Sequence, residues 1–319
     1  MPPNSARQRA EVTRNVDPEL VEGLKGMPAL DLSDVAAARE ELQAFLRLSP
    51  QQVPAGVRVW SDVAAGPGGG AVPVRIYRHA ATTTATGALL WFHGGGFVLG
   101  SPDMDDAFCG AVAAKLGLIV ISVDYRLAPE HPYPAAVDDC WSALRWLATQ
   151  GERLGIDPAR IALGGQSAGG GLAAATALRA RDDGRPDVAA QLLLEPVLDV
   201  RLATPSMRNG AETPIWNLPR AQQSWGLYLG GHEPTPYGSP ALAGDLRGLP
   251  PCYLRTNELD PLLDEGIDYA WRLLRAGVSV ELHNLPGTFH GFSGIGTAAI
   301  SRRARSEVIE VLRRLLFEP

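Results

Sequence analysis

Two glycine-rich segments about seventy residues apart contain the residue types that serine chemistry requires. They are His93–Phe97 (HGGGF) and Gly165–Gly169 (GQSAG). The second fits Gly-x-Ser-x-Gly, a sharp turn between a strand and a helix that exposes a serine hydroxyl. The first fits a loop whose backbone N–H groups face a developing oxyanion. Each segment follows a short apolar run, and together they predict acyl transfer through a serine nucleophile.

Ser167 is the nucleophile that this pattern predicts. The strand-like run 161–163 precedes it, and the small residues 169–175 follow it as a helix. A Gly-x-Ser-x-Gly match also arises by chance in a glycine-rich chain. The order strand, turn, helix is the context that a functional motif requires, and it is present here. The glycines on either side of the serine permit a tight turn, and the helix start places backbone donors beside the hydroxyl.

The nucleophile needs a base, because a serine hydroxyl is a poor nucleophile at neutral pH. In proteins with this turn the chain order is nucleophile, acid, histidine, which leaves His232, His283 and His290. His283 lies inside a predicted strand, 278–285, where a structural role is expected. His232 lies in a polar turn that is typical of a solvated loop. His290 follows the strand in a loop at its carboxyl end, and we assign it as the base.

The acid must orient the histidine and stabilise the imidazolium. Asp260 follows the predicted strand 252–255 and precedes a helix, which is the placement that the role needs. We assign it as the acid on the chain order of the motif. The alternatives are two neighbours in sequence and two acids after an earlier strand: Glu258, Asp264, Glu195 and Asp199.

The oxyanion hole is predicted to combine the N–H groups of Gly94, Gly95 and Ala168, the residue after the nucleophile. Glycine suits this loop because the backbone must approach the substrate. We expect His93 to support the loop through a hydrogen bond rather than to carry a proton. Packing is the simpler expectation for Gly96.

Substrate contacts are predicted for three aromatic residues: Phe97, Trp216 and Trp225. Tyr228 is a further aromatic residue of the same region. Aromatic side chains at such spacing serve equally well as the core of a covering segment, so that alternative stays open.

Alternation of apolar runs with helical patterns predicts a mainly parallel sheet with helices on both faces. The strands are expected at 57–60, 72–77, 88–92, 118–123, 160–163, 191–194, 252–255 and 278–282. The helices are expected near 105–116, 135–149, 168–182, 219–229, 262–276 and 298–317. The glycines of 66–70 are predicted to connect a hairpin, because no helix follows them as a phosphate-binding loop would need.

Residues 1–50 are predicted to be helical and amphipathic. Asp17-Pro18-Glu19 resembles a capped helix start, and a second segment begins at Ser33 with an apolar face that includes Leu42 and Phe45. The region 201–225 is rich in Pro, Asn and Trp and breaks the alternation, so we expect it to be an excursion above the sheet.

Composition places the chain among ordinary globular proteins. It has 319 residues, 45% of them hydrophobic and 20% charged, with 29 basic against 35 acidic side chains and a net charge of -6. Without a basic stripe we expect no nucleic-acid partner. No run approaches the length of a membrane span, the start lacks a secretory apolar core, and three scattered cysteines predict a reducing, cytoplasmic compartment.

The chain resembles the hormone-sensitive-lipase-like family of α/β-hydrolases, which includes microbial carboxylesterases. The two glycine segments carry this resemblance together with Asp124–Ala136 (DYRLAPEHPYPAA), Asp260–Leu262 and His290–Phe292. The similarity covers about residues 90–292, and the long segment is its most specific part. Its Arg126, Glu130 and prolines fit a structural brace better than chemistry.

The resemblance implies an eight-stranded, mostly parallel sheet flanked by helices, with the second strand antiparallel. It implies a triad of Ser167, Asp260 and His290, and no metal or organic cofactor. It also implies a helical cap, built from residues 1–50 and an insertion at about 200–230 of a catalytic domain that spans 51–319. Gln166 departs from the family, which usually has an acidic residue before the nucleophile, so a charge-dependent contact there is in doubt.

The expected function is hydrolysis of short- to medium-chain carboxylic esters through an acyl-enzyme, with a small-molecule ester as substrate. An amidase or deacetylase with the same triad is the nearer alternative. A small-molecule receptor is the more distant one, since a plant gibberellin receptor with a replaced triad histidine has this fold. The resemblance also makes a homodimer an expectation.

Overall fold

Eight strands form one sheet in the computed structural model, which describes residues 15–28, 30–48, 52–84 and 86–318. The predictions for residues 1–14 lie outside the described residues. The strands are β1 Val57–Ala65, β2 Ala71–His79, β3 Thr86–Phe92, β4 Ile119–Val123, β5 Ile156–Gln166, β6 Ala190–Leu194, β7 Cys252–Asn257 and β8 Val280–Leu285.

The strand order in the sheet is β1-β2-β4-β3-β5-β6-β7-β8. β2 runs antiparallel to both of its neighbours, and every other pairing is parallel. The expectation of a mostly parallel sheet with an antiparallel second strand is therefore confirmed. The carboxyl ends of β3, β5, β7 and β8 meet at one edge of the sheet, where ligands bind in such folds.

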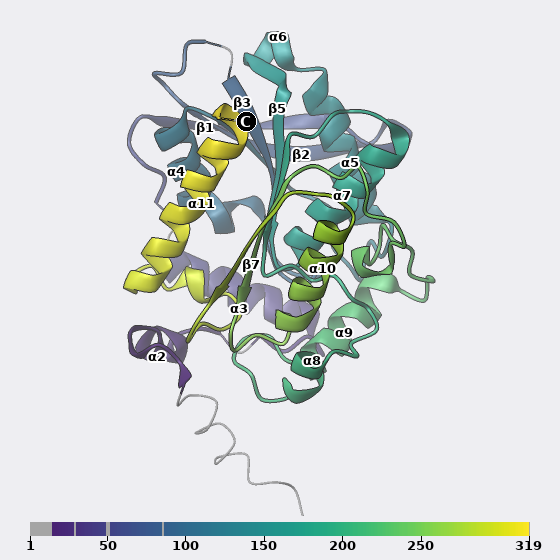
Figure 1. Ribbon diagram of the computed structural model, residues 1–319. Helices are drawn as coiled ribbons and strands as arrows, with labels where there is room; N and C mark the ends of the chain where they lie inside the picture. Colours follow the sequence, from purple (N-terminus) through teal and green to yellow (C-terminus); the bar gives the residue numbers. More distant parts are fainter. Residues whose placement is uncertain (1–14, 29, 49–51, 85, 319) are drawn as a thin grey trace, which may run out of the picture.

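Helices cover both faces of the sheet (Figure 1). α4 Asp106–Leu116 and α11 Ala299–Phe317 lie on one face, while α5 Ala135–Ala148, α7 Ala168–Asp183 and α10 Leu263–Arg275 lie on the other. α6 Gly151–Leu154 is a single turn before β5. Every residue of β3 and of β6 is buried, because a strand covered on two sides exposes neither face to water.

The β1–β2 hairpin is connected through the glycine stretch, as predicted, with a short 3₁₀ turn at Pro67–Gly69. The boundaries of β5 differ more from the expectation, since this strand begins at Ile156 instead of Arg160. Residues 157–160 of this strand are partly or fully exposed, so the apolar run marked only the buried part that follows them. All three cysteines are buried and unpaired.

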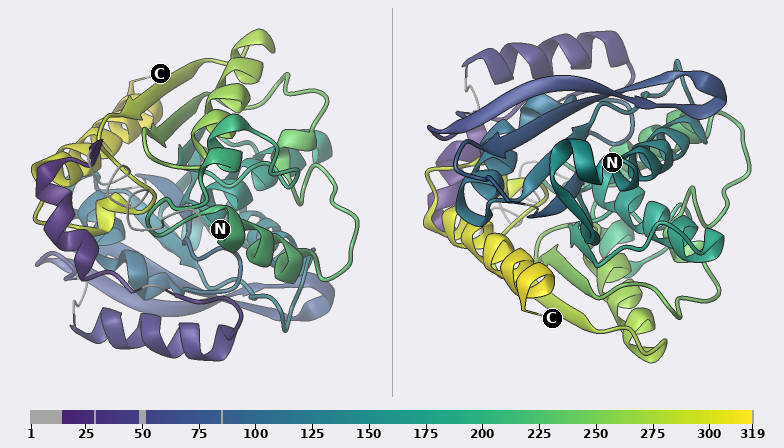
Figure 2. Two further views of the ribbon diagram at one scale, coloured as in Figure 1. Left: turned by 90° about the horizontal axis from the view of Figure 1, so that it is seen from below. Right: turned by 90° about the horizontal axis from the view of Figure 1, so that it is seen from above.

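Four helices gather beyond the carboxyl ends of the strands (Figures 1 and 2). They are α2 Pro18–Lys25, α3 Val35–Leu48, α8 Pro205–Asn209 and α9 Leu218–Leu229. Asp17 caps α2 by accepting a hydrogen bond from the N–H of Glu19. α8 and the first turns of α9 occupy the predicted excursion. The division into cap and catalytic domain stays a prediction.

α3 is tied to the glycine-rich loop after β3 by one side chain. Arg39 donates hydrogen bonds to the carbonyls of Val98 and Ala128 and forms a bidentate ion pair with Glu130. Leu42, on the same helix, packs near Val98 in a small apolar cluster. α3 is thereby fixed to the loop that carries Gly94 and Gly95.

Candidate active site

Ser167 lies at the turn between β5 and α7 in a strained backbone conformation, with φ 57° and ψ -122°. The turn closes because the flanking glycines have no side chains. A Cβ on Gly165 would lie 2.2 Å from the carbonyl oxygen of Gly169, and one on Gly169 would lie 1.9 Å from that of Phe92. The N–H of Ser167 donates to Leu194 of β6, which fixes the turn over the sheet. The side chain of Ser167 makes no capping hydrogen bond to α7.

His290 and Asp260 complete a chain of hydrogen bonds with Ser167. The Nε2 of His290 lies 2.8 Å from Ser167 Oγ, and its Nδ1 lies 2.7 Å from Asp260 Oδ2. The three residues come from the ends of β5, β7 and β8, and all three are buried. This arrangement can take a proton from the hydroxyl at Nε2 while the carboxylate holds the proton at Nδ1.

None of the four alternative acids forms a hydrogen bond with His290. Glu258 accepts from the N–H of Gly287, and Asp264 accepts from that of Ser206. Asp199 pairs with Arg201, and Glu195 pairs with Arg255. The other two candidate histidines are also elsewhere: His283 contacts Glu281 and Glu307, and His232 is exposed on the loop after α9.

The surroundings of His290 act on its pKa in opposite directions. Burial works to lower the pKa, whereas the charge and hydrogen bond of Asp260 and the charge of Glu195 raise it. The net result is a pKa above the ordinary value of 6.5. The imidazolium that would form during proton transfer is therefore stabilised in place.

Three backbone N–H groups at this site have no hydrogen-bond partner in the described part of the chain: those of Gly94, Gly95 and Ala168. Ala168 opens α7, where the first N–H groups of a helix have no partner within it. A Cβ built on Gly94 would lie 3.5 Å from the Cβ of Ser167, so the loop passes close to the nucleophile. Unpaired donors in this position can bind an oxyanion.

His93 supports the loop, as its expected role requires. Its Nδ1 lies 2.7 Å from the carbonyl oxygen of Gly94, and its ring stacks on Tyr125 with centroids 4.2 Å apart. Burial lowers the pKa of His93 to about 4, so the ring is neutral near pH 7 and its Nδ1–H donates to the Gly94 carbonyl. Arg126, near the start of the segment Asp124–Ala136, forms a bidentate ion pair with Asp139. This contact is consistent with the structural role expected for Arg126.

A buried polar network lies beside the nucleophile. This network was not predicted from the sequence. Gln166 donates from Nε2 to Glu195 Oε1 at 2.6 Å, and Arg255 donates to Glu195 Oε2 at 2.6 Å. Glu195 and Arg255 are each 1% exposed. One signal was available: a charged residue in each of two apolar strand regions needs an opposite charge if both are buried.

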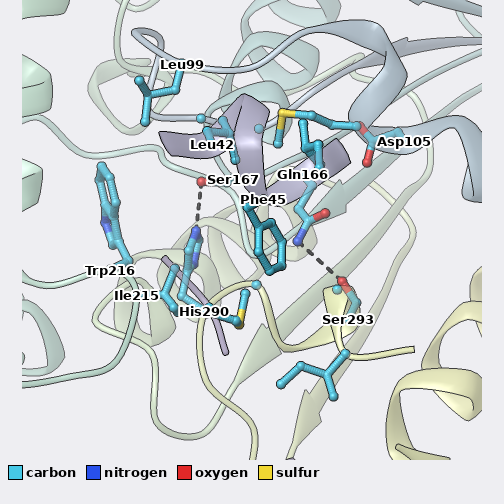
Figure 3. Close-up of a pocket in the computed structure, with 18 of the residues that line it drawn as sticks. Leu42, Phe45, Leu99, Asp105, Gln166, Ser167, Ile215, Trp216, His290 and Ser293 are labelled. Carbon is cyan, nitrogen blue, oxygen red and sulfur yellow. Dashed lines mark hydrogen bonds between the residues drawn. The ribbon is translucent and has the colours of Figure 1, made fainter. Parts of the chain in front are cut away.

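A cavity of about 770 Å³ opens over Ser167 and His290 (Figure 3). Apolar side chains of the amino-terminal helices line part of it, including Leu42 and Phe45, and Trp216 lies beside His290 with ring centroids 5.8 Å apart. The cavity is of the size that small-molecule sites have.

Phe97 and Trp225 do not line this cavity, contrary to the expectation that they contact substrate. Phe97 stacks on Tyr228 with ring centroids 4.0 Å apart, and Trp225 packs against both rings. All three are buried in the main core. They hold α9 against the glycine-rich loop, which is the packing role that the sequence had left open. Of the three predicted substrate contacts, only Trp216 lines the cavity.

The described residues contain no group of three or more His, Cys, Asp or Glu side chains that could hold a metal ion. In the same part of the chain, no helix is long and apolar enough to cross a membrane.

Comparisons with known proteins agree with this geometry. A family model described as alpha/beta hydrolase fold matches residues 89–294. Esterase LipI of Mycobacterium tuberculosis is 39% identical over 310 residues, which cover 94% of this chain and 95% of the relative. Ethyl acetate hydrolase of Pseudomonas putida is 37% identical over 236 residues, or 72% of this chain and 74% of the relative.

Solved structures are similar over nearly the whole chain. A bacterial heroin esterase has 47% identity and a TM-score of 0.93, with 95% of this chain and 98% of that chain covered. Esterase LipW from Mycobacterium marinum has 39% identity and a TM-score of 0.89, with 96% and 97% covered.

Proposed function

The chain belongs to the α/β-hydrolase family, in its hormone-sensitive-lipase-like branch, and we propose that it hydrolyses carboxylic esters through Ser167, His290 and Asp260. Ester hydrolysis as the class of reaction follows from esterase relatives that match most of the chain. The observation that supports these three residues is the unbroken hydrogen-bond chain from Asp260 through His290 to Ser167.

The first step forms an acyl-enzyme. Ser167 Oγ attacks the acyl carbon while Nε2 of His290 takes its proton. The carbonyl oxygen becomes negatively charged and accepts hydrogen bonds from the N–H groups of Gly94, Gly95 and Ala168. His290 then gives its proton to the leaving alcohol, and the carbon–oxygen bond to the alcohol breaks. Asp260 stays ionised throughout and stabilises the imidazolium.

Water completes the cycle. It enters the space that the alcohol has left, gives a proton to Nε2 of His290 and attacks the acyl carbon. The second tetrahedral intermediate collapses by releasing Ser167, whose oxygen recovers the proton from His290. The products are a free acid, a free alcohol and the original enzyme.

The cavity supports a small ester as the substrate. Its walls near Trp216 are largely apolar, with Leu42, Phe45 and Leu99 among them, so an acyl or alcohol group of short to medium length would bury its surface there. A homodimer remains the expectation that the family resemblance supplies.

Replacing Ser167 by Ala tests the proposal. We expect the hydrolysis of a p-nitrophenyl acyl ester to fall by about ten-thousand-fold or more. A fluorophosphonate probe should label the wild type and not the variant. Ser293 lines the same cavity, so Ser293→Ala serves as the matched control and should still be labelled. Turnover that survives in a folded Ser167→Ala protein would refute the assignment.

A further inference from the structure

The cavity contains one carboxylate that ester hydrolysis does not use. Asp105 ends the short 3₁₀ turn Pro102–Asp105 before α4, and its side chain lines the cavity together with Ser167 and His290. In the view of Figure 3, Trp216 and Leu99 lie on one side of the Ser167–His290 pair and Asp105 lies on the other. No other Asp or Glu lines the cavity among the described residues.

One carboxylate oxygen of Asp105 accepts a hydrogen bond from the protein, and the other does not. The indole N–H of Trp91, near the end of β3, donates to Oδ2 at 2.7 Å. Its Oδ1 has no hydrogen-bond partner in the part of the chain that the structure describes, and no Lys, Arg or His there pairs with it. The nearby Arg75 is already engaged by Asp106 in a bidentate ion pair.

The charges that act on Asp105 are negative. Burial and the carboxylates of Asp106 and Asp103 together raise its pKa to about 6, against the hydrogen bond from Trp91, which lowers it. At about pH 7.5 the group is therefore ionised in a partly apolar site. An ionised carboxylate with one free oxygen in such a place is a strong acceptor for a charged donor.

Aromatic rings frame this carboxylate. Trp91 and Phe108 also line the cavity, with ring centroids 4.6 Å apart. Aromatic rings attract cations. Trp91 is 1% exposed and meets Asp105 through its indole N–H, whereas Phe108 is only partly buried, so Phe108 is the ring that a cation in the cavity can contact. The side chain of Gln166 adds an amide oxygen, because its Nε2 is turned toward Glu195 and Ser293.

We propose that Asp105, oriented by Trp91 and flanked by Phe108, forms a subsite for a protonated amine, so that the preferred substrates are esters that carry an ammonium group. The ammonium N–H would donate to Asp105 Oδ1 while its alkyl groups lie against Phe108. This proposal deepens the proposed function and rests on it, since the same cavity must hold the ester carbonyl at Ser167.

Three arginines also line the cavity, and each already binds another group of the protein. Arg255 is neutralised by Glu195, Arg220 donates to the carbonyl of Ile215, and Arg305 donates to that of Gly296. None of them is among the groups that act on the charge of Asp105. The experiment nevertheless includes an anionic substrate.

Three ethyl esters of matched shape test the acyl side: ethyl 4-(dimethylamino)butanoate, which is cationic, ethyl 5-methylhexanoate, which is neutral, and monoethyl glutarate, which is anionic. For the alcohol side, 2-(dimethylamino)ethyl acetate is compared with 3-methylbutyl acetate. The measured quantity is the ratio of kcat/KM for the cationic ester to kcat/KM for its neutral partner, in the wild type and in Asp105→Asn.

The expected result is a ratio that falls by about tenfold or more in Asp105→Asn for at least one of the two pairs. Comparing this ratio between the two proteins cancels the intrinsic reactivity of each ester, and the asparagine can still accept the bond from Trp91. Asp103→Asn removes the same charge from an exposed neighbour and is the matched control, in which the ratio should change little. An unchanged ratio in Asp105→Asn, an equal fall in Asp103→Asn, or a wild-type preference for monoethyl glutarate would overturn the proposal.

Failure of the proposed function can be distinguished from failure of the subsite. It would appear as turnover of the neutral esters that persists in Ser167→Ala. A binding measurement then tests the subsite alone: calorimetric titration of ethyl 4-(dimethylamino)butanoate into Ser167→Ala and into Ser167→Ala/Asp105→Asn. We expect about tenfold weaker binding in the second protein, and equal affinities would overturn the subsite.

Discussion

Asp260 holds His290 from the side opposite to Ser167, with 2.7 Å between Oδ2 and Nδ1. Its carboxylate is itself fixed, because Oδ1 accepts from the N–H of Leu262 at 3.0 Å and Oδ2 accepts from Asn257 at 3.2 Å. The proton of the neutral imidazole must therefore lie on Nδ1, which leaves Nε2 as the acceptor that faces the serine hydroxyl. One carboxylate sets both the orientation and the tautomer of the ring.

Asp260→Asn should lower kcat by about ten-thousand-fold while the protein stays folded. The amide would donate to Nδ1 and so favour the tautomer with its proton on Nε2, which cannot accept from Ser167. Steady-state kinetics with a p-nitrophenyl ester measures the effect. Glu258→Gln alters a carboxylate on the same loop that contacts Gly287 instead of His290, and it should retain most of the activity. Near-normal turnover in Asp260→Asn would move the acid to another residue.

The pH dependence of kcat/KM should follow His290. Only the neutral ring can accept the serine proton, so activity is lost as the pH falls through the pKa of His290. Because that pKa is raised above 6.5 by Asp260 and Glu195 despite burial, the acid limb of the profile should have its midpoint above 6.5. A neutral, non-ionising ester keeps the profile free of substrate titration. A midpoint at or below 6.5 would contradict this prediction.

Much of the fold followed from local patterns in the sequence. The runs that became β3 and β6 are apolar except for Thr86 and Gln191, because helices cover both of their faces, and this continuity made them easy to place. The order of strands in the sheet did not follow from such patterns. β4 lies between β2 and β3, so β2 pairs with β4 instead of the strand that follows it in the chain, and no local pattern marks that choice.

Some residues of the candidate site could be predicted from the sequence, and others could not. Ser167 and the glycine loop were found because the chemistry fixes residue types over five consecutive positions. His290 and Asp260 were assigned from their places at strand ends, and the structure brings both into hydrogen-bond contact. Asp105 was not found, because its partner Trp91 lies in the preceding apolar run and nothing local marks the pair.

Two adjacent glycines of the loop should respond differently to alanine. At Gly95, φ is +120° and a Cβ would lie 2.1 Å from the carbonyl oxygen of Leu99, so Gly95→Ala should lower both the melting temperature and kcat. At Gly94 the nearest atoms to a Cβ are at 3.4 Å or more. Gly94→Ala should therefore keep its melting temperature, yet lose about tenfold to a hundredfold in kcat/KM, because the methyl group intrudes beside Ser167.

Thermal unfolding and kinetics measured on the same samples separate these two effects. Gly226→Ala is the control, since a Cβ at this position in the last turn of α9 meets no atom within 4 Å. It should match the wild type in kcat/KM and melt at the same temperature or slightly higher, because alanine favours a helix over glycine. Full activity in Gly94→Ala would argue that substrate does not approach this part of the loop.

Gln166 determines how much negative charge the network beside the nucleophile can hold. Its amide donates to Glu195 Oε1, and a single cation, Arg255, neutralises Glu195. Gln166→Glu would place a second carboxylate against the first with no further cation, so one of the two would have a raised pKa in the folded state.

A raised carboxyl pKa makes the folded protein bind a proton that the unfolded chain does not hold, so stability decreases as the pH rises through that pKa. Urea unfolding of Gln166→Glu should therefore show a deficit of about 1–3 kcal/mol at about pH 8 that shrinks toward about pH 5. Gln166→Met removes the same hydrogen bond without adding charge, and its deficit should be similar at both pH values. If Gln166→Glu were as stable as the wild type at the higher pH, the Glu195–Arg255 pair would have to accept a second negative charge without cost, which its burial opposes.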